Sequence, residues 1–297
     1  MTAENPITRR RAVRAAGVAG AAYIAAPALL SGLLSPATAQ AATLAAKLTP
    51  ELTEGPYWVN TMLRRSDIRA NTKAAGTSPG VRQKGVPLKL TINERDASNH
   101  RKPLNGVAVD IWRANAHGLY SDETPQQAGG GTSGADTSGE NFLRGYQITG
   151  KDAGIHRSAV AGQVSFETIW PGWYTSRAIH IHVRVRKLST SGATIAGYTT
   201  QIFFSDADNN RVLTGAAPYD SRSPQKDATT DENDTVLQSS DDATNIVSVK
   251  GSIRQGFSAT FNIILDNAEV TADGSLSRPS SGGGPLRAGG KDECVRE

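Results

Sequence analysis

The chain has 297 residues, with 32 basic and 28 acidic side chains and a formal net charge of +4. This length suits one large domain or two small ones. The basic excess lies at the N-terminus: residues 1–41 contain four arginines and one glutamate, so 28 basic and 27 acidic residues remain beyond them. Because no basic stripe occurs elsewhere, the composition argues against a nucleic-acid partner.

The first 41 residues have the pattern of an export signal. Arginines occur at Arg9–Arg11, an apolar Ala-rich run covers Ala15–Leu34, and small-x-small cleavage sites follow at Ala37–Ala39 and Ala39–Ala41. This order is typical of a cleaved twin-arginine signal. A membrane anchor is the alternative interpretation, but Pro27 interrupts the apolar run. We therefore expect a secreted or extracytoplasmic protein that has no membrane anchor after cleavage.

Seven segments between turn-forming residues alternate apolar and polar side chains, as β-strands do. They are predicted at Leu88–Glu94, Val107–Ala114, Gln163–Ile169, Ala178–Val185, Tyr198–Phe204, Ile246–Val249 and Ser258–Leu265. No segment between them carries a long helical stripe. The expected fold class is all-β, with a β-sandwich core.

The rest of the chain is arranged around this core. We predict an export signal over residues 1–41 and an N-terminal arm that packs on the core over residues 42–85. The sandwich itself is predicted over residues 86–267, and a flexible Gly- and Ser-rich tail over residues 268–297. Long polar segments at 122–140 and 206–243 have the length of functional or disordered loops. The lone Cys294 excludes an internal disulfide. It is either an incidental thiol or a link between subunits, so a homo-oligomer is possible.

Two histidines suggest a metal site. His180 and His182 share one face of a predicted strand, so both imidazoles can reach one point. Alone, the pair is more simply explained as the polar face of a half-exposed strand. Two tyrosines change this balance: Tyr174 follows a Pro-Gly turn just upstream, and Tyr120 follows another strand. Phenolate and imidazole ligands together suit iron(III) better than zinc.

Several short motifs occur in a specific order along the chain. They are Thr49–Tyr57, Arg65–Arg69, Gly106–Trp112, Gly118–Tyr120, Phe142–Gly145, Pro171–Tyr174, Arg177, His180–His182 and Gln201–Phe204. In this order they resemble the intradiol ring-cleavage dioxygenases, specifically exported members related to protocatechuate 3,4-dioxygenase and catechol 1,2-dioxygenase. The resemblance implies that long loops on the sandwich form the active site.

The resemblance also implies a non-haem iron(III) centre. Tyr120 and His180 would be its equatorial protein ligands, and Tyr174 and His182 its axial ligands. Tyr174 would leave the metal when substrate arrives and take up a proton, which gives it a catalytic role as well.

Four further positions are implied near the substrate. Arg177 and Gln201 correspond to residues that stabilise the charged, ketonised ring, and Tyr57 to a residue at the pocket mouth. Trp173 is a candidate pocket residue because it lies within the ligand turn, with simple packing as the alternative.

The implied reaction uses O2 to cleave a catechol between its hydroxylated carbons, giving a cis,cis-muconate-type diacid without an external reductant. Two alternatives are a non-catalytic transthyretin-like β-sandwich binding module, which needs no iron, and an iron(II) extradiol dioxygenase. The second uses two histidines and a carboxylate, and no carboxylate has a comparable relation to His180 and His182 in the sequence. Which catechol is the substrate is left open.

Overall fold

The computed structural model describes residues 47–72, 78–124, 135–221, 228–240 and 243–266. The predicted signal, the predicted tail and Cys294 lie outside these residues, so the domain boundaries stay predictions. Within the described ranges, no helix is both long and apolar enough to cross a membrane.

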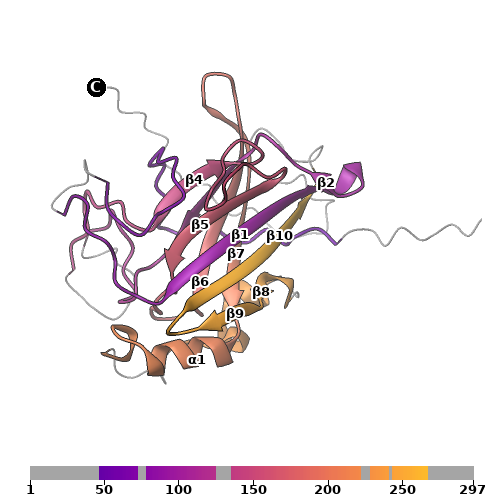
Figure 1. The fold of residues 1–297 in the computed structure, drawn as a ribbon. Helices are drawn as coiled ribbons and strands as arrows, with labels where there is room; N and C mark the ends of the chain where they lie inside the picture. The colour runs from indigo at the N-terminus through magenta and orange to yellow at the C-terminus, as the bar shows by residue number, and fades with distance from the viewer. Residues whose placement is uncertain (1–46, 73–77, 125–134, 222–227, 241–242, 267–297) are drawn as a thin grey trace, which may run out of the picture. The chain divides into compact units, whose positions relative to one another are not determined.

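The first sheet is built around β1 (Pro87–Asp96). One edge of β1 pairs in parallel with β10 (Gly256–Leu265), and β10 also pairs with β9 (Val249–Ser252). The other edge of β1 pairs antiparallel with β5 (Gln163–Ile169) and with the short β2 (Lys102–Pro103). Figure 1 shows β5, β1, β10 and β9 side by side in that order.

The second sheet carries the predicted histidine pair. Its strands are, in spatial order, β4 (Arg144–Ile148), β3 (Ala108–Trp112), β6 (His180–Leu188), β7 (Thr194–Phe204) and β8 (Ile246–Val247). All pairs are antiparallel except β7 with β8, which is parallel. Both sheets are therefore mixed.

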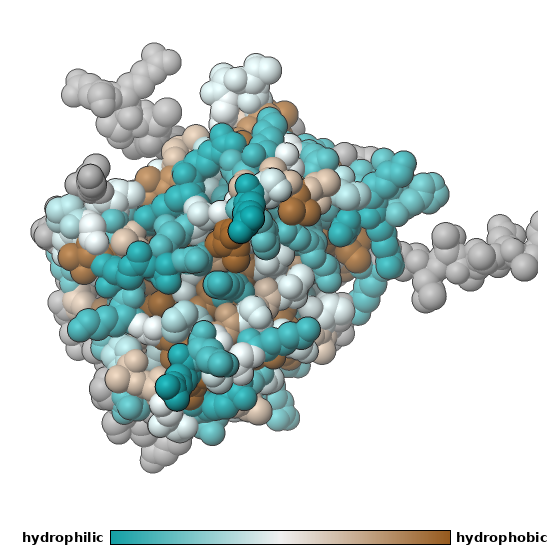
Figure 2. All heavy atoms as spheres, in the orientation of Figure 1, coloured by the Kyte–Doolittle hydropathy of each residue, from teal (hydrophilic) through white to brown (hydrophobic). Residues whose placement is uncertain are grey.

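Alternating side chains of both sheets form one hydrophobic core. Leu90 and Ile92 of β1 belong to the same buried cluster as Ile181 and Val183 of β6. Burying each such side chain contributes about 1.5–3 kcal/mol. After Pro87 the outward residues of β1 are polar, and Asn93 accepts a hydrogen bond from the Gln163 amide. In the same orientation, Figure 2 shows mainly hydrophilic and intermediate side chains with small hydrophobic spots between them.

The prediction of a mostly-sheet chain is confirmed, and its strand boundaries are partly right. The prediction for β5 matches at both ends, while the strand predicted over Ile246–Val249 is divided between β8 and β9. Strands β2 and β4 were not predicted. The shorter helical elements are α2 (Thr235–Gln238) and the 3-10 turns η1 (Ala97–Asn99), η2 (Tyr219–Ser221), η4 (Asp231–Asn233) and η5 (Ala243–Asn245).

Helix α1 (Asp206–Gly215) lies in the segment that was expected to be a long loop. It begins at Ser205, whose hydroxyl accepts a hydrogen bond from the Asp208 amide, as a helix N-cap does. Only Asn209, Val212 and Leu213 are buried, so the helix lacks the long apolar stripe that sequence patterns reveal. Figure 1 shows α1 beside β9.

Candidate metal centre

Strand β6 places His180 and His182 on the face opposite the core. Their Nε2 atoms are 3.0 Å apart. The two side chains are 3% and 0% exposed, so the interpretation of a half-exposed polar strand face is wrong. A second layer of residues covers this face of the sheet.

The sheet register sets the neighbours of His182. Trp112 of β3 and Gln201 of β7 lie directly opposite it on the two adjacent strands. The Trp112 ring stacks on the His182 imidazole, with ring centroids 4.7 Å apart and an interplanar angle of 9°. The alternation of apolar and polar residues along one strand shows which side chains share a face. It does not show the register between neighbouring strands, which places Trp112 opposite His182.

The orientation of His180 is set by a backbone carbonyl. Its Nδ1 lies 2.6 Å from the Ala178 oxygen. A carbonyl can only accept, so Nδ1 carries the proton and the Nε2 lone pair faces the cluster. Burial, followed by the positive charge of Arg177, lowers the pKa of His180 to about 3. The imidazole is therefore neutral near pH 7, as a metal ligand must be.

Tyr120 is presented by a turn after β3. The Asn115 side-chain oxygen accepts hydrogen bonds from the backbone amides of His117 and Leu119. This Asx-type turn reverses the chain. The Tyr120 hydroxyl consequently lies 3.1 Å from Nε2 of His182 and 3.4 Å from Nε2 of His180.

Tyr174 is presented by a second turn that packs against the first. The Gly172 amide donates to the Asn115 carbonyl at 3.0 Å. A Cβ at Gly172 would lie 2.5 Å from the carbonyl oxygens of Asn115 and Ala116, so this contact requires glycine. The Tyr174 hydroxyl is thereby placed 3.0 Å from Nε2 of His180.

The four donor atoms fit a small cation. Four of their pairwise separations are 3.0–3.4 Å, which resemble those of ligand atoms around one ion at bond lengths of about 2.0–2.1 Å. Burial raises the pKa of Tyr120 well above its usual value and that of Tyr174 to about 12. Both phenols therefore keep their protons near pH 7 unless a cation stabilises the phenolates. Among the described residues no group of three or more His, Cys, Asp or Glu could hold a metal, so the tyrosines are essential to this fit.

Arg177 and Gln201 lie together beside this cluster. Arg177 Nη2 donates to Gln201 Oε1 at 2.5 Å, and the Gln201 amide donates to the Thr53 carbonyl at 2.8 Å. The positive charge of Arg177 acts to lower the pKa of all four donor side chains. The structure therefore brings both predicted substrate-side residues next to the predicted ligands.

The two candidate pocket residues differ. The Tyr57 ring stacks on Tyr120 with centroids 4.3 Å apart and meets Tyr174 edge-on at 6.1 Å. Trp173 is 6% exposed and belongs to the main core cluster, whereas the aromatic cluster contains Tyr57, Tyr120 and Tyr174. The observed packing of Trp173 therefore supports the alternative that it is a core residue.

Arg144 is a buried residue to which sequence reasoning gave no role. It donates to the Tyr57 carbonyl at 2.5 Å and to the Ser121 carbonyl at 2.6 Å. It thus ties the arm that carries Tyr57 to the loop that carries Tyr120. The available signal was its place in the motif Phe142–Gly145, but its partners are far away in sequence.

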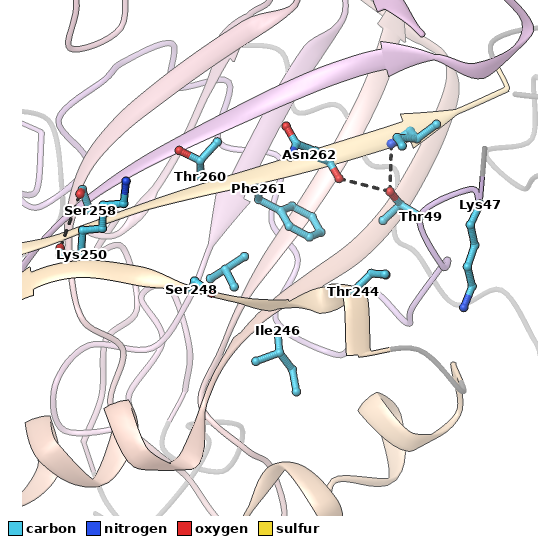
Figure 3. Close-up of a pocket in the computed structure, with 12 residues that line it drawn as sticks. Lys47, Thr49, Thr244, Ile246, Ser248, Lys250, Ser258, Thr260, Phe261 and Asn262 are labelled. Carbon is cyan, nitrogen blue, oxygen red and sulfur yellow. Dashed lines mark hydrogen bonds between the residues drawn. The ribbon is translucent and has the colours of Figure 1, made fainter. Parts of the chain in front are cut away.

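A surface groove of about 660 Å³ lies elsewhere, along β10 (Figure 3). Its lining residues are Lys47, Thr49, Thr244, Ile246, Val247, Ser248, Lys250, Ser258, Thr260, Phe261, Asn262 and Ile264. None is a predicted site residue, so the groove is separate from the candidate metal centre.

Known proteins share this sequence pattern and fold. A family model described as "Dioxygenase" matches residues 53–214, a span that contains the four donors, Tyr57, Arg177 and Gln201. An intradiol ring-cleavage dioxygenase from Tetranychus urticae is 26% identical, with 73% of this chain and 93% of that chain covered and a TM-score of 0.56. A second dioxygenase crystal structure is 25% identical, with the same coverage and a TM-score of 0.53. Among curated proteins, none matches.

Proposed function

Since this chain belongs to the intradiol ring-cleavage dioxygenase family, whose model covers more than half of it, we propose that it cleaves catechol-type rings with O2. The products would be cis,cis-muconate-type diacids. The observation that carries the proposal is the convergence of two phenol oxygens and two imidazole nitrogens beside the Arg177–Gln201 pair.

The proposed cofactor is iron(III), held by Tyr120, Tyr174, His180 and His182. Two phenolates are hard anionic ligands that favour a trivalent ion, and no cysteine takes part. When bound, ferric iron supplies the positive charge that lets a catechol lose its phenolic protons near pH 7 and the electron-accepting character that makes the ring reactive toward O2.

Tyr174 is the proposed proton acceptor. Its phenol pKa of about 12, raised by burial and lowered in part by Arg177, exceeds the value of about 10 for an ordinary phenol. A Tyr174 phenolate therefore takes a proton from a substrate hydroxyl. Tyr174 is proposed for this role rather than Tyr120 because it lies on a turn and is 9% exposed. The Tyr120 side chain is 1% exposed and stacks on Tyr57.

Arg177 and Gln201 are the proposed stabilisers of charge on the substrate ring. The Arg177 side chain is 14% exposed and Gln201 is fully buried, so their dipoles and charge act where water is scarce. Fixed donors in such an environment stabilise developing negative charge far more strongly than in water. Tyr57 is proposed to cover the ring from the side of the N-terminal arm.

Oxygen uptake by the iron-loaded protein with catechol, protocatechuate, hydroxyquinol and caffeate tests this function. We expect a red-brown protein, coloured by tyrosinate-to-iron charge transfer, that consumes one O2 per ring cleaved with at least one of these catechols. A colourless, iron-replete protein would contradict the ligand set. A protein without uptake on any catechol would support the transthyretin-like binding module, and a yellow semialdehyde product would support extradiol cleavage.

The localisation and the layer arrangement are also proposals. We propose twin-arginine export, supported by the sequence pattern of residues 1–41. Replacing Arg9 and Arg10 by Lys should retain the protein in the cytoplasm, and unchanged export would contradict this proposal.

We propose that the two sheets form a β-sandwich, supported by the core cluster that both share. A crystal structure in which the sheets do not face each other would contradict it.

A further inference from the structure

The carboxylate of Asp234 is fully buried and accepts four hydrogen bonds. Its Oδ2 accepts from Arg177 Nε at 2.9 Å and from the Ala178 amide at 2.7 Å. Its Oδ1 accepts from the Val236 and Leu237 amides at 2.9 and 3.0 Å. One carboxylate therefore joins the start of α2 to the segment that leads into β6.

The first contact fixes the Arg177 side chain. The guanidinium is planar, and two of its nitrogens are held: Nε by Asp234 and Nη2 by Gln201. Two anchors on a planar group set both its position and its tilt. The direction in which the remaining N–H groups of Arg177 can point is then determined by these two partners.

The second contact reaches His180 through one residue, Ala178. Asp234 accepts from the Ala178 amide, and the Ala178 carbonyl accepts from His180 Nδ1 at 2.6 Å. The residue that orients this imidazole is therefore itself held by Asp234. A group that hydrogen-bonds a metal ligand directly, as the Ala178 carbonyl does with His180, commonly affects affinity or activity by about 10- to 100-fold.

We propose that Asp234 is a positioning residue that fixes the substrate-side cation Arg177 and the ligand His180 together. The inference rests on the proposed function, since it assigns roles around the same centre. Asp234 lies beyond residue 214, where the family match ends. It belongs to the segment 206–243, whose role the sequence left open.

An asparagine at this position separates positioning from folding. Asn caps helices as well as Asp does, so its single oxygen can keep the bonds from Val236 and Leu237. Its amide nitrogen then faces the N–H donors of Arg177 and Ala178, which it cannot accept. Asp234→Asn is therefore expected to keep α2 and to lose both positioning contacts.

The control is Asp231→Asn. Asp231 is also buried, in the adjacent turn η4, and accepts no hydrogen bond from Arg177 or Ala178 in the described structure. Both variants, made in the full chain and loaded with iron, are compared by turnover on the catechol that the wild type uses fastest. We expect Asp234→Asn to lower kcat by about 10- to 100-fold and Asp231→Asn to leave it unchanged.

Two readouts separate positioning from a general structural role. On an Arg177→Ala background, Asp234→Asn should lower kcat by a smaller factor than it does in the wild type, because only the route through Ala178 and His180 is left. The charge-transfer band of the resting protein should shift in Asp234→Asn, through His180, and not in Asp231→Asn. Equal losses of kcat on both backgrounds, or a wild-type kcat and band in Asp234→Asn, would overturn the inference.

The outcome is distinguishable from failure of the proposed function. If the wild type shows neither colour nor oxygen uptake, the proposed function fails before any variant is compared. If Asp234→Asn does not fold by circular dichroism, Asp234→Ser is measured against the same criteria, since Ser also caps helices and is too short to reach Arg177.

Discussion

At the scale of single residues, three of the four donor side chains are each oriented by a different contact. His180 donates to a backbone carbonyl, His182 stacks on Trp112, and Tyr120 stacks on Tyr57. These contacts are made by the aromatic rings and by Nδ1 of His180, and not by the hydroxyl oxygens and Nε2 atoms that converge. The hydroxyl oxygen of Tyr120 can therefore be removed while its ring stays stacked on Tyr57.

Tyr120→Phe removes one donor oxygen and keeps the stacked ring. We expect the iron content per chain and the visible charge-transfer absorption to fall together, because the remaining phenolate leaves more of the iron charge uncompensated. Metal analysis and absorption of the purified variant measure this. Tyr146→Phe, which alters a buried tyrosine of β4 outside the cluster, is the control, and a fully coloured Tyr120→Phe protein would exclude Tyr120 as a ligand.

Arg177→Ala should separate iron binding from turnover. Arg177 donates to Asp234 and Gln201, and to none of the four donor atoms. We therefore expect iron and colour to remain while kcat falls by about 10²- to 10³-fold, the usual effect of removing one stabiliser of developing charge. Steady-state oxygen uptake measures kcat, and a rate equal to that of wild type would remove the proposed electrostatic role.

The convergence of the two histidines and two tyrosines could be predicted from the sequence, whereas the residues that hold their surroundings in place could not. Strand alternation places both histidines on one face, and the motif order identifies the two tyrosines. Arg144 and Asp234 act on groups that lie more than fifty positions away along the chain, at Tyr57 and at Arg177. Such contacts depend on how remote loops pack, which no local pattern records.

At the scale of elements, the register of β3, β6 and β7 aligns Trp112, His182 and Gln201 across the sheet. The alternation of apolar and polar residues in the sequence predicted these three strands and which of their side chains face the core. It missed β4, whose buried residues include Arg144 and Gln147, because charged and amide side chains break the apolar pattern. It also missed α1, which buries only a few residues.

The turn that carries Tyr174 depends on a close backbone approach at Gly172. Gly172→Ala would place a Cβ 2.5 Å from two carbonyl oxygens, so the two ligand turns must move apart. We expect a destabilisation of about 1–3 kcal/mol together with weaker iron binding, measured by urea denaturation and by competition with a chelator. Gly197→Ala in β7 is the control, since its Cβ would make ordinary contacts of 3.6–3.8 Å; equal behaviour of the two variants would contradict the expectation.

At the scale of the whole molecule, one polar group interrupts the shared core. Glu94 of β1 is fully buried, and neither carboxylate oxygen has a hydrogen-bond partner among the described residues. Burial raises the pKa of Glu94 well above its usual value. The folded state therefore holds a proton that the unfolded chain releases above about pH 4.5, and stability falls as the pH rises from there toward the folded pKa.

Glu94→Gln should remove this pH dependence. Relative to wild type, the variant should gain stability as the pH rises above about 4.5, by at most about 1.4 kcal/mol per pH unit. Urea denaturation at several pH values measures the difference. Glu232→Gln, which alters an exposed carboxylate, is the control, and a constant difference between Glu94→Gln and wild type across this range would contradict the account.

The central claim concerns the whole protein: iron(III) held by two tyrosines and two histidines cleaves a catechol between its hydroxylated carbons. The most direct test is mass analysis of the product formed by the iron-loaded protein from its fastest catechol under oxygen-18 gas. The account predicts a cis,cis-muconate-type diacid that carries label from O2 in its new carboxyl groups. A ring-opened semialdehyde, or substrate recovered intact from an iron-replete protein, would contradict it.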